Sequence, residues 1–188
     1  AISLSNCFLE IMVRTIYAKL QKKYEFLCNQ YPKPYPSFHM ETKYYLYGMK
    51  ITLLAIGKTD NGNLQHLIED YEKRLSHYVS FQLEMIPDIK NAKNLSEAQQ
   101  KQAEGSEILK RLQAGDRLVL LDEKGKALTS EGFAQFLQKK MNSGLKNLVF
   151  VIGGPYGFSE EIYNRAQGKV SLSNMTFSHQ MVRLFFIE

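Results

Sequence analysis

From Met49 onward, short apolar segments alternate with longer amphipathic segments, and this alternation constrains the fold more than any other feature. The apolar segments cover residues 50–57, 81–85, 117–122, 148–152 and 169–173. Short apolar runs that end in glycine or polar turn residues are typical of buried strands. Strands that alternate with helices predict a mostly parallel sheet with helices on both faces. The sequence therefore predicts an α/β fold for residues 49–188.

The helices between these strands have recognisable ends. Side chains that accept hydrogen bonds from free backbone N–H groups precede each expected start. Gly115, Gly144 and Gly168 are expected to close the second, third and fourth helices. A fifth helix is expected to begin at His179. The expected N-caps of the first four are Asn63, Ser96 (with Gln99 in capping-box spacing), Thr129 or Ser130, and Ser159.

Residues 1–48 differ in composition from the rest of the chain. Ten of the 22 Phe and Tyr residues lie there, together with the segment Tyr-Pro-Lys-Pro-Tyr-Pro at 31–36, which proline keeps extended or turning. Residues 5–28 could form one helix. Two interpretations stay open. Either this segment is translated from upstream of a true initiator at Met49, or it is a helical extension that packs on the domain.

Charge, cysteine and histidine usage exclude several classes of site. The net charge is +5, but residues 49–188 hold eighteen Lys/Arg and sixteen Asp/Glu, so any nucleic-acid binding would need a local basic patch. Cys7 and Cys28 lie outside CxxC or CxxH patterns and the four histidines are scattered. We therefore expect no disulfide framework and no metal site. Without a long apolar run or a basic leader, a cytoplasmic protein with no membrane contact is expected.

Two segments carry the signal for a ligand site. Residues 149–157 (Val-Phe-Val-Ile-Gly-Gly-Pro-Tyr-Gly) run from a strand into a glycine turn, and residues 172–183 run from a strand through a polar loop into a helix. Loops of this kind at strand ends are where α/β sheets bind ligands. The first strand lacks a glycine-rich loop, which argues against a dinucleotide site. Gly57-Lys58-Thr59 follows that strand, but the complete P-loop pattern Gly-x-x-x-x-Gly-Lys-Ser/Thr is absent because position 52 is threonine, which argues against a P-loop. A flavodoxin-like nucleotide-binding protein is disfavoured because the glycine motif follows the fourth strand, not the first.

The motifs at 49–58, 120–126, 150–157 and 172–183 resemble the ribosomal large subunit methyltransferase H family, which belongs to the SPOUT class. The resemblance covers residues 49–188 and leaves 1–48 without a counterpart. It implies an α/β fold whose C-terminal segment is threaded into a trefoil knot. It also implies binding of S-adenosylmethionine, a homodimeric full-length protein, and methylation of N3 of a pseudouridine in 23S ribosomal RNA of the assembled ribosome.

The same resemblance implies the cofactor contacts, and the chemistry of methyl transfer to a ring nitrogen, which must lose its proton, suggests the catalytic candidates. Arg183 is the candidate for binding phosphate or stabilising a developing anion, with a helix-surface arginine as the alternative. His179 could accept a proton or could cap its helix. A branched side chain at Gly154 is expected to block the cofactor by filling its space and by tolerating positive φ badly. The expected cofactor contacts are Leu121, Gly153, Gly154, Leu172, Ser173, Asn174, Met175, Thr176 and Phe177.

The end of the chain departs from the family pattern. Family members continue past the position of Glu188 with a helix that contains a Tyr-Arg pair and a tail that carries Pro-Tyr-His. We therefore expect residues 49–188 to be a C-terminally truncated domain that is largely monomeric and impaired in methyl transfer. The alternative function is a truncated, non-catalytic RNA- or ribosome-binding member of the family.

Overall fold

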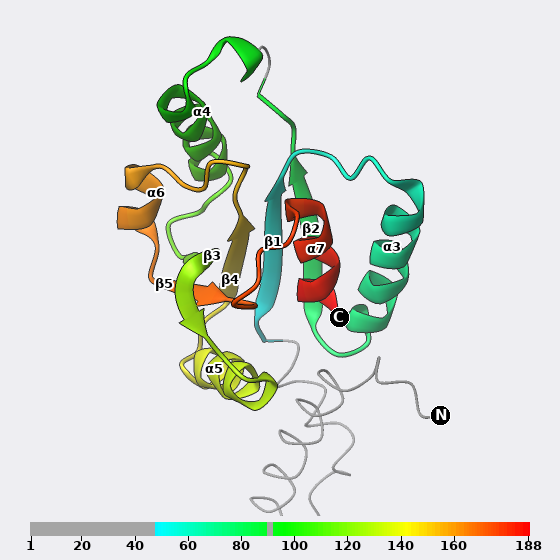
Figure 1. Ribbon diagram of the computed structural model, residues 1–188. Coiled ribbons are helices and arrows are strands. Elements are labelled where there is room, and N and C mark those ends of the chain that lie inside the picture. Colours follow the sequence, from blue (N-terminus) through cyan, green and yellow to red (C-terminus); the bar gives the residue numbers. More distant parts are fainter. Residues whose placement is uncertain (1–47, 90–91) are drawn as a thin grey trace, which may run out of the picture.

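The computed structural model describes residues 48–89 and 92–188 (Figure 1). Both interpretations of residues 1–48 fall outside this range, apart from Gly48 itself. Strands and helices alternate along the chain, which confirms the predicted α/β class. The elements are β1 (Lys50–Ile56), α3 (Gly62–Ser76), β2 (Ser80–Ile86), the 3-10 helix η2 (Ala92–Asn94), α4 (Glu97–Leu109), β3 (Arg117–Ala127), α5 (Ser130–Asn142), β4 (Asn147–Ile152), α6 (Glu160–Arg165), β5 (Gly168–Ser171) and α7 (His179–Ile187).

The five strands form one sheet in the order β2-β1-β4-β3-β5, and every pair is parallel. Parallel strands end at the same edge of a sheet, so the turn after β4 and the loop after β5 both lie beside residues 121–124 of β3, although these segments are far apart in sequence. A ligand site built from these loops therefore has its parts in adjacent positions.

Strand residues divide between two hydrophobic cores, because successive side chains point to opposite faces of the sheet. In β1, Leu53 and Ala55 pack under α3, α5 and α7, whereas Leu54 and Ile56 pack under α4 and α6. Figure 1 shows α3 and α7 on one side of the sheet and α4 and α6 on the other. This double burial explains why the strands are apolar along their whole length.

Several predicted helix ends are shifted. Asn61, not Asn63, caps α3 by accepting from the N–H groups of Asn63 and Leu64. The capping box at Ser96 and the caps at Thr129 and Ser159 are confirmed. α4 ends at Leu109, six residues before Gly115, and α6 ends at Arg165, so Gly168 begins β5 and does not close a helix.

The second half of β3 lies closely against β5. Val170 pairs first with Leu121 and then with Lys126, so the residues between them form a bulge over the edge strand. A Cβ atom at Gly125 would lie 2.6 Å from the Val170 carbonyl carbon and 2.8 Å from the Ser171 nitrogen. Only glycine allows this approach.

After β5 the chain returns across the sheet. α7 lies beside α3 and near β1, whereas β5 lies at the opposite edge (Figure 1). Residues 172–178, which join β5 to α7, therefore pass over the carboxyl ends of the central strands. In the described residues, no helix is long and apolar enough to cross a membrane. The same residues contain no group of three His, Cys, Asp or Glu side chains arranged to hold a metal ion.

Candidate functional site

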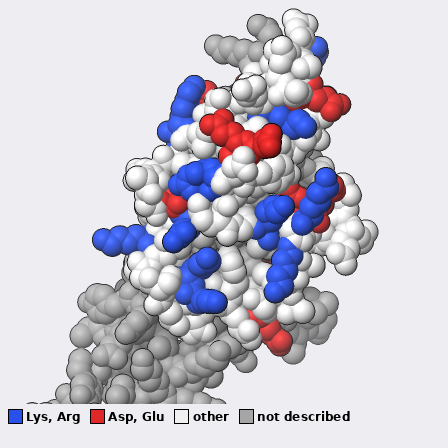
Figure 2. Space-filling model, turned by 90° about the vertical axis from the view of Figure 1, so that its left-hand side faces the viewer, with Lys and Arg blue, Asp and Glu red and all other residues white. Residues whose placement is uncertain are grey.

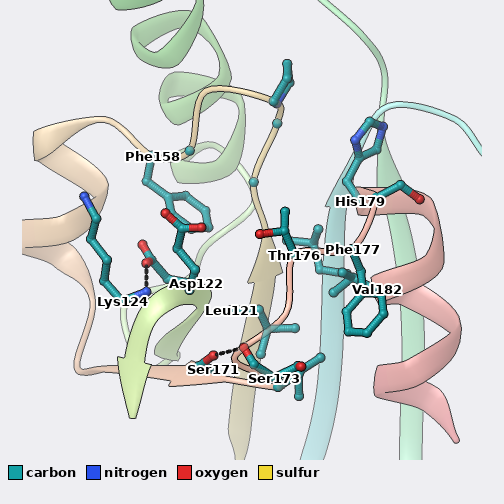
Figure 3. Close-up of a pocket in the computed structure, with 18 of the residues that line it drawn as sticks. Leu121, Asp122, Lys124, Phe158, Ser171, Ser173, Thr176, Phe177, His179 and Val182 are labelled. Carbon is teal, nitrogen blue, oxygen red and sulfur yellow. Dashed lines mark hydrogen bonds between the residues drawn. The ribbon is translucent and has the colours of Figure 1, made fainter. Parts of the chain in front are cut away.

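A pocket of about 440 Å³ lies at the ends of β4 and β5, beside residues 121–124 of β3. Figure 3 shows Asp122 and Lys124 on one side, Thr176, Phe177, His179 and Val182 on the other, and Leu121 between them. Eight of the nine predicted cofactor residues line this pocket, and Asn174 does not. The lining comes from the middle of β3 (residues 121–124), the end of β4 and the turn after it (residues 152–158), Tyr163, and the segment at 171–179 with Val182.

The turn after β4 is held by backbone contacts. The Gly157 N–H donates to the Gly154 carbonyl at 3.1 Å, and Gly157 has a φ of +80°, which favours glycine. Gly154 is not among the described glycines with positive φ, so the expectation that a side chain there would be strained by φ is wrong. A side chain at Gly154 is instead excluded by lack of space, because a Cβ atom there would lie 2.5 Å from an oxygen of Glu104.

The loop at 172–177 forms the opposite wall and is ordered by its own serines. The Ser171 hydroxyl donates to the Ser173 carbonyl at 2.8 Å, and the Ser173 hydroxyl accepts from the Met175 N–H at 2.9 Å. With serines satisfying its backbone, the loop leaves apolar side chains facing outward: Met175 is 72% exposed. The wall is therefore a fixed backbone with apolar groups free to contact a ligand.

A carboxylate and a phenol form the polar side of the pocket. Asp122 accepts hydrogen bonds from the Lys124 N–H at 2.7 Å and from the Tyr163 hydroxyl at 2.5 Å. Burial, followed by the hydrogen bond and charge of Asp122, raises the pKa of Tyr163 to about 12. The Lys169 ammonium lies 5.2 Å from the centre of the Tyr163 ring. These contacts fix the orientation of the Asp122 carboxylate.

His179 lies at the rim of the pocket and begins α7. The expectation that it caps this helix is wrong, because the Ser178 hydroxyl accepts from the Met181 N–H as the N-cap. In the described structure, no hydrogen bond or ion pair holds the imidazole, so it is available to a substrate at the pocket mouth.

Arg183 lies in the interior and is not among the residues that line the pocket. Its guanidinium donates to the Thr59 hydroxyl at 2.6 Å and to the Ile56 and Gly57 carbonyls at 2.8 and 3.1 Å. Burial lowers the pKa of Arg183, while the nearby Asp88 and Asp60 oppose that shift. The alternative of a helix-surface arginine is therefore wrong, and the side chain ties α7 to the carboxyl end of β1.

Sequence reasoning missed part of the pocket. Asp122 ends the apolar run of the third strand, and that position was a usable signal for it, although β3 itself continues to Ala127. Tyr163 and Lys169 had no such signal, because they reach the site only through the position of α6 and β5 beside β3.

Comparisons with known proteins give the family. A family model described as "Predicted SPOUT methyltransferase" matches residues 49–188. The "Ribosomal RNA large subunit methyltransferase H" of Flavobacterium johnsoniae is 72% identical over 140 residues, which cover 74% of this chain and 89% of that protein. The proteins of the same name from Parabacteroides distasonis and Bacteroides thetaiotaomicron are 64% and 54% identical over the same shares of each chain. Because the family model spans residues 49–188 and these relatives are 54–72% identical over 140 residues, the chain belongs to the ribosomal RNA large subunit methyltransferase H family of SPOUT methyltransferases.

Proposed function

We propose that this protein methylates N3 of a pseudouridine in 23S ribosomal RNA of the assembled ribosome, with S-adenosylmethionine bound in the pocket formed by residues 121–124 of β3 and the ends of β4 and β5. The single observation that carries this proposal is that eight of the nine residues expected to contact the cofactor line one pocket. The names of the relatives specify large-subunit ribosomal RNA.

The residues of the pocket fit this cofactor. Its volume of about 440 Å³ is within the range of roughly 300–1,000 Å³ typical of small-molecule sites. Leu121, Ile152 and Leu172 offer apolar surface for an adenine ring, and the backbone of the two loops offers hydrogen-bonding groups. Asp122 places a carboxylate beside a ligand that carries positive charge. When bound, the cofactor supplies a methyl group on a sulfonium, which is already a strong electrophile.

The protein's own part is positioning and proton removal. A reactant held in line gains much of its rate from orientation alone. The target ring nitrogen must also lose a proton, and a base near the mouth of the pocket would assist that loss. His179 is our candidate for that base, because its imidazole is at the rim and has no fixed partner in the described structure. Arg183 would act indirectly, by holding α7 and therefore His179 in place.

Ribosomal RNA also needs a surface for its phosphates. Figure 2 shows Lys and Arg side chains spread across the middle of the face that carries α6, β5 and the end of β3. Lys124 and Lys169 lie on these elements, are exposed, and are not ion-paired within residues 48–89 and 92–188. Unpaired cations beside the pocket suit an RNA backbone.

We further propose that a chain spanning the full length of these relatives forms a homodimer, whereas the 188-residue chain is largely monomeric. Leu172, Met175, Phe177, Met181 and Phe185 expose apolar surface along the loop and α7, and a contiguous apolar surface of this kind is typical of an interface. Sedimentation of the 188-residue chain alongside one extended at its C-terminus tests this part of the proposal. Equal dimer populations in the two chains would contradict it.

Two measurements test the activity. Titration calorimetry with S-adenosylmethionine should detect binding, and Gly154→Val should abolish it, whereas Gly115→Val should not, because nothing lies within 4 Å of a Cβ at Gly115. Radiolabelled methyl transfer should occur to ribosomes from a strain that lacks this modification, and less to naked RNA. Cofactor binding without transfer to either substrate would favour the non-catalytic alternative. No cofactor binding would refute the proposal.

A further inference from the structure

α4 carries a carboxylate in the interior. Glu104 is only 3% exposed, although glutamate is seldom buried unless it is paired. One of its oxygens accepts from the Gln100 amide at 2.8 Å, and the other has no hydrogen-bond partner in the described residues. Buried polar atoms nearly always have partners, so an oxygen without one calls for an explanation.

The carboxylate lies directly behind the glycine turn of the pocket. A Cβ at Gly154 would be 2.5 and 2.6 Å from the two Glu104 oxygens, which is closer than real atoms approach. Glu104 therefore contacts the turn only because residue 154 has no side chain. The pKa of Glu104 is raised, chiefly by burial and further by the charge of Asp88. The Gln100 hydrogen bond and the Gly154 backbone act in the opposite direction and lower it.

The next residue of α4 fixes the other end of the same loop. A Cβ at Gly105 would lie 2.5 Å from the Ser159 hydroxyl and 3.3 Å from Ile162. Ser159 is the N-cap of α6, so α4 touches the loop where it leaves β4 and again where it enters α6. Between these points, residues 154–158 line the pocket.

We propose that Glu104 is a positioning residue of the cofactor site. From the side of the turn away from the pocket, its carboxylate sets where the Gly154 backbone lies, and through it the shape of the wall that contacts the cofactor. This inference rests on the proposed function, because it assumes that S-adenosylmethionine occupies the pocket. It adds a residue of α4 to a site that is otherwise built from strand ends.

The first experiment compares Glu104→Ala and Glu104→Gln with Glu107→Ala. Glu107 is a matched control, because it lies on the same helix but its carboxylate bonds to Lys110 and Arg111 and not to the turn. Glu104→Ala should raise the dissociation constant for S-adenosylmethionine roughly tenfold, in line with the loss of one buried polar contact. Glu104→Gln keeps the shape and should fall between wild type and Glu104→Ala. Glu107→Ala should bind as wild type does.

A double-mutant cycle separates a contact from a general loss of stability. Gly154→Ala should weaken binding strongly in the wild-type background, because its methyl group collides with the carboxylate. In the Glu104→Ala background the same substitution should cost at least fivefold less. Equal penalties in the two backgrounds would overturn the proposal, as would unchanged cofactor affinity in Glu104→Ala.

Hydrogen exchange in the ligand-free protein gives a readout that does not depend on the cofactor. Backbone amides of residues 153–158 should exchange faster in Glu104→Ala than in Glu107→Ala, with melting temperatures measured for both. If wild type fails to bind S-adenosylmethionine, the proposed function fails, but faster exchange would still show that Glu104 holds the turn. Unchanged exchange at 153–158 would show that it does not.

Discussion

Arg183 places a guanidinium in the protein interior, where it bonds to two carbonyls and a hydroxyl and not to a carboxylate. The carbonyls of Ile56 and Gly57 end β1, and Gly57 has a φ of +83°. One side chain therefore satisfies the end of a central strand and anchors the final helix. A buried carbonyl without a donor would cost free energy comparable to a lost hydrogen bond.

Arg183→Ala should lower the free energy of unfolding by about 3–5 kcal/mol, the range found when one partner of a buried charged interaction is removed. Arg183→Lys should recover little of this, because one ammonium cannot reproduce the planar fork of the guanidinium. Urea unfolding measures the effect. Gln180→Ala, on the same helix with an exposed bond to Asp60, is the control and should change stability little. An Arg183→Ala midpoint equal to that of the control would contradict the anchoring role.

Tyr163 is expected to stay protonated well above the usual range for tyrosine. Its pKa is raised to about 12 from 10.0, so its proton is bound more tightly in the folded than in the unfolded state. Its contribution to stability is therefore fully present below pH 10 and is lost as the pH rises toward 12. Absorbance of tyrosinate, compared between wild type and Tyr163→Phe, should show only a small ionised fraction of Tyr163, about a tenth, at pH 11. A difference transition near pH 10 would show that the Asp122 contact is not formed in solution.

At the scale of elements, the sequence predicted the positions of most strands well, but it did not predict which strands lie side by side in the sheet. The apolar runs located β1, β2 and β4 within one residue at each end, because burial on both faces leaves a continuous signal. The expected end of β3 at Asp122 was wrong, because its continuation to Ala127 is mostly exposed and pairs only with the crossing β5. The order β4-β3-β5 leaves no trace in local pattern, and for that reason Tyr163 and Glu104 could not be assigned to the site.

Helix ends were the least predictable features. Asn61 and Asn63 are both good caps two positions apart, and local sequence does not decide between them. Eight predicted residues do line the pocket, because strand ends of a parallel sheet must share an edge. That these residues bind the cofactor stays a prediction, since it depends on a ligand and not on the fold.

Gly125→Ala tests the crossing of β3 over β5. The added Cβ would meet backbone atoms of Val170 and Ser171 below 3 Å, and backbone held in a sheet cannot move aside cheaply. Overpacking of this kind costs about 1–3 kcal/mol, so the melting temperature should fall by several degrees. Gly115→Ala is the control, because a Cβ there meets nothing within 4 Å. Equal melting temperatures for the two variants would show that the segments are not in close contact.

At the scale of the whole molecule, charge is a matter of placement and not of amount. Residues 49–188 are close to neutral overall, yet Figure 2 shows cations spread across one face. Several other cations are neutralised locally: Lys73 pairs with Asp70, and Lys110 and Arg111 pair with Glu107. A lysine beside a carboxylate forms a nearly neutral pair that attracts a polyanion weakly, so the unpaired lysines should dominate RNA affinity.

We therefore expect the double substitution Lys124→Ala with Lys169→Ala to weaken RNA binding roughly tenfold at about 0.15 M salt. It should also reduce the slope of log affinity against log salt by about 1.4–1.8, since each phosphate contact contributes about 0.7–0.9. Lys73→Ala with Lys110→Ala removes the same net charge from paired positions and should change both quantities much less. Fluorescence anisotropy with a labelled ribosomal RNA fragment over a range of salt concentrations measures both. If the two double variants lose affinity equally, net charge alone accounts for binding, and the face beside the pocket has no special part in it.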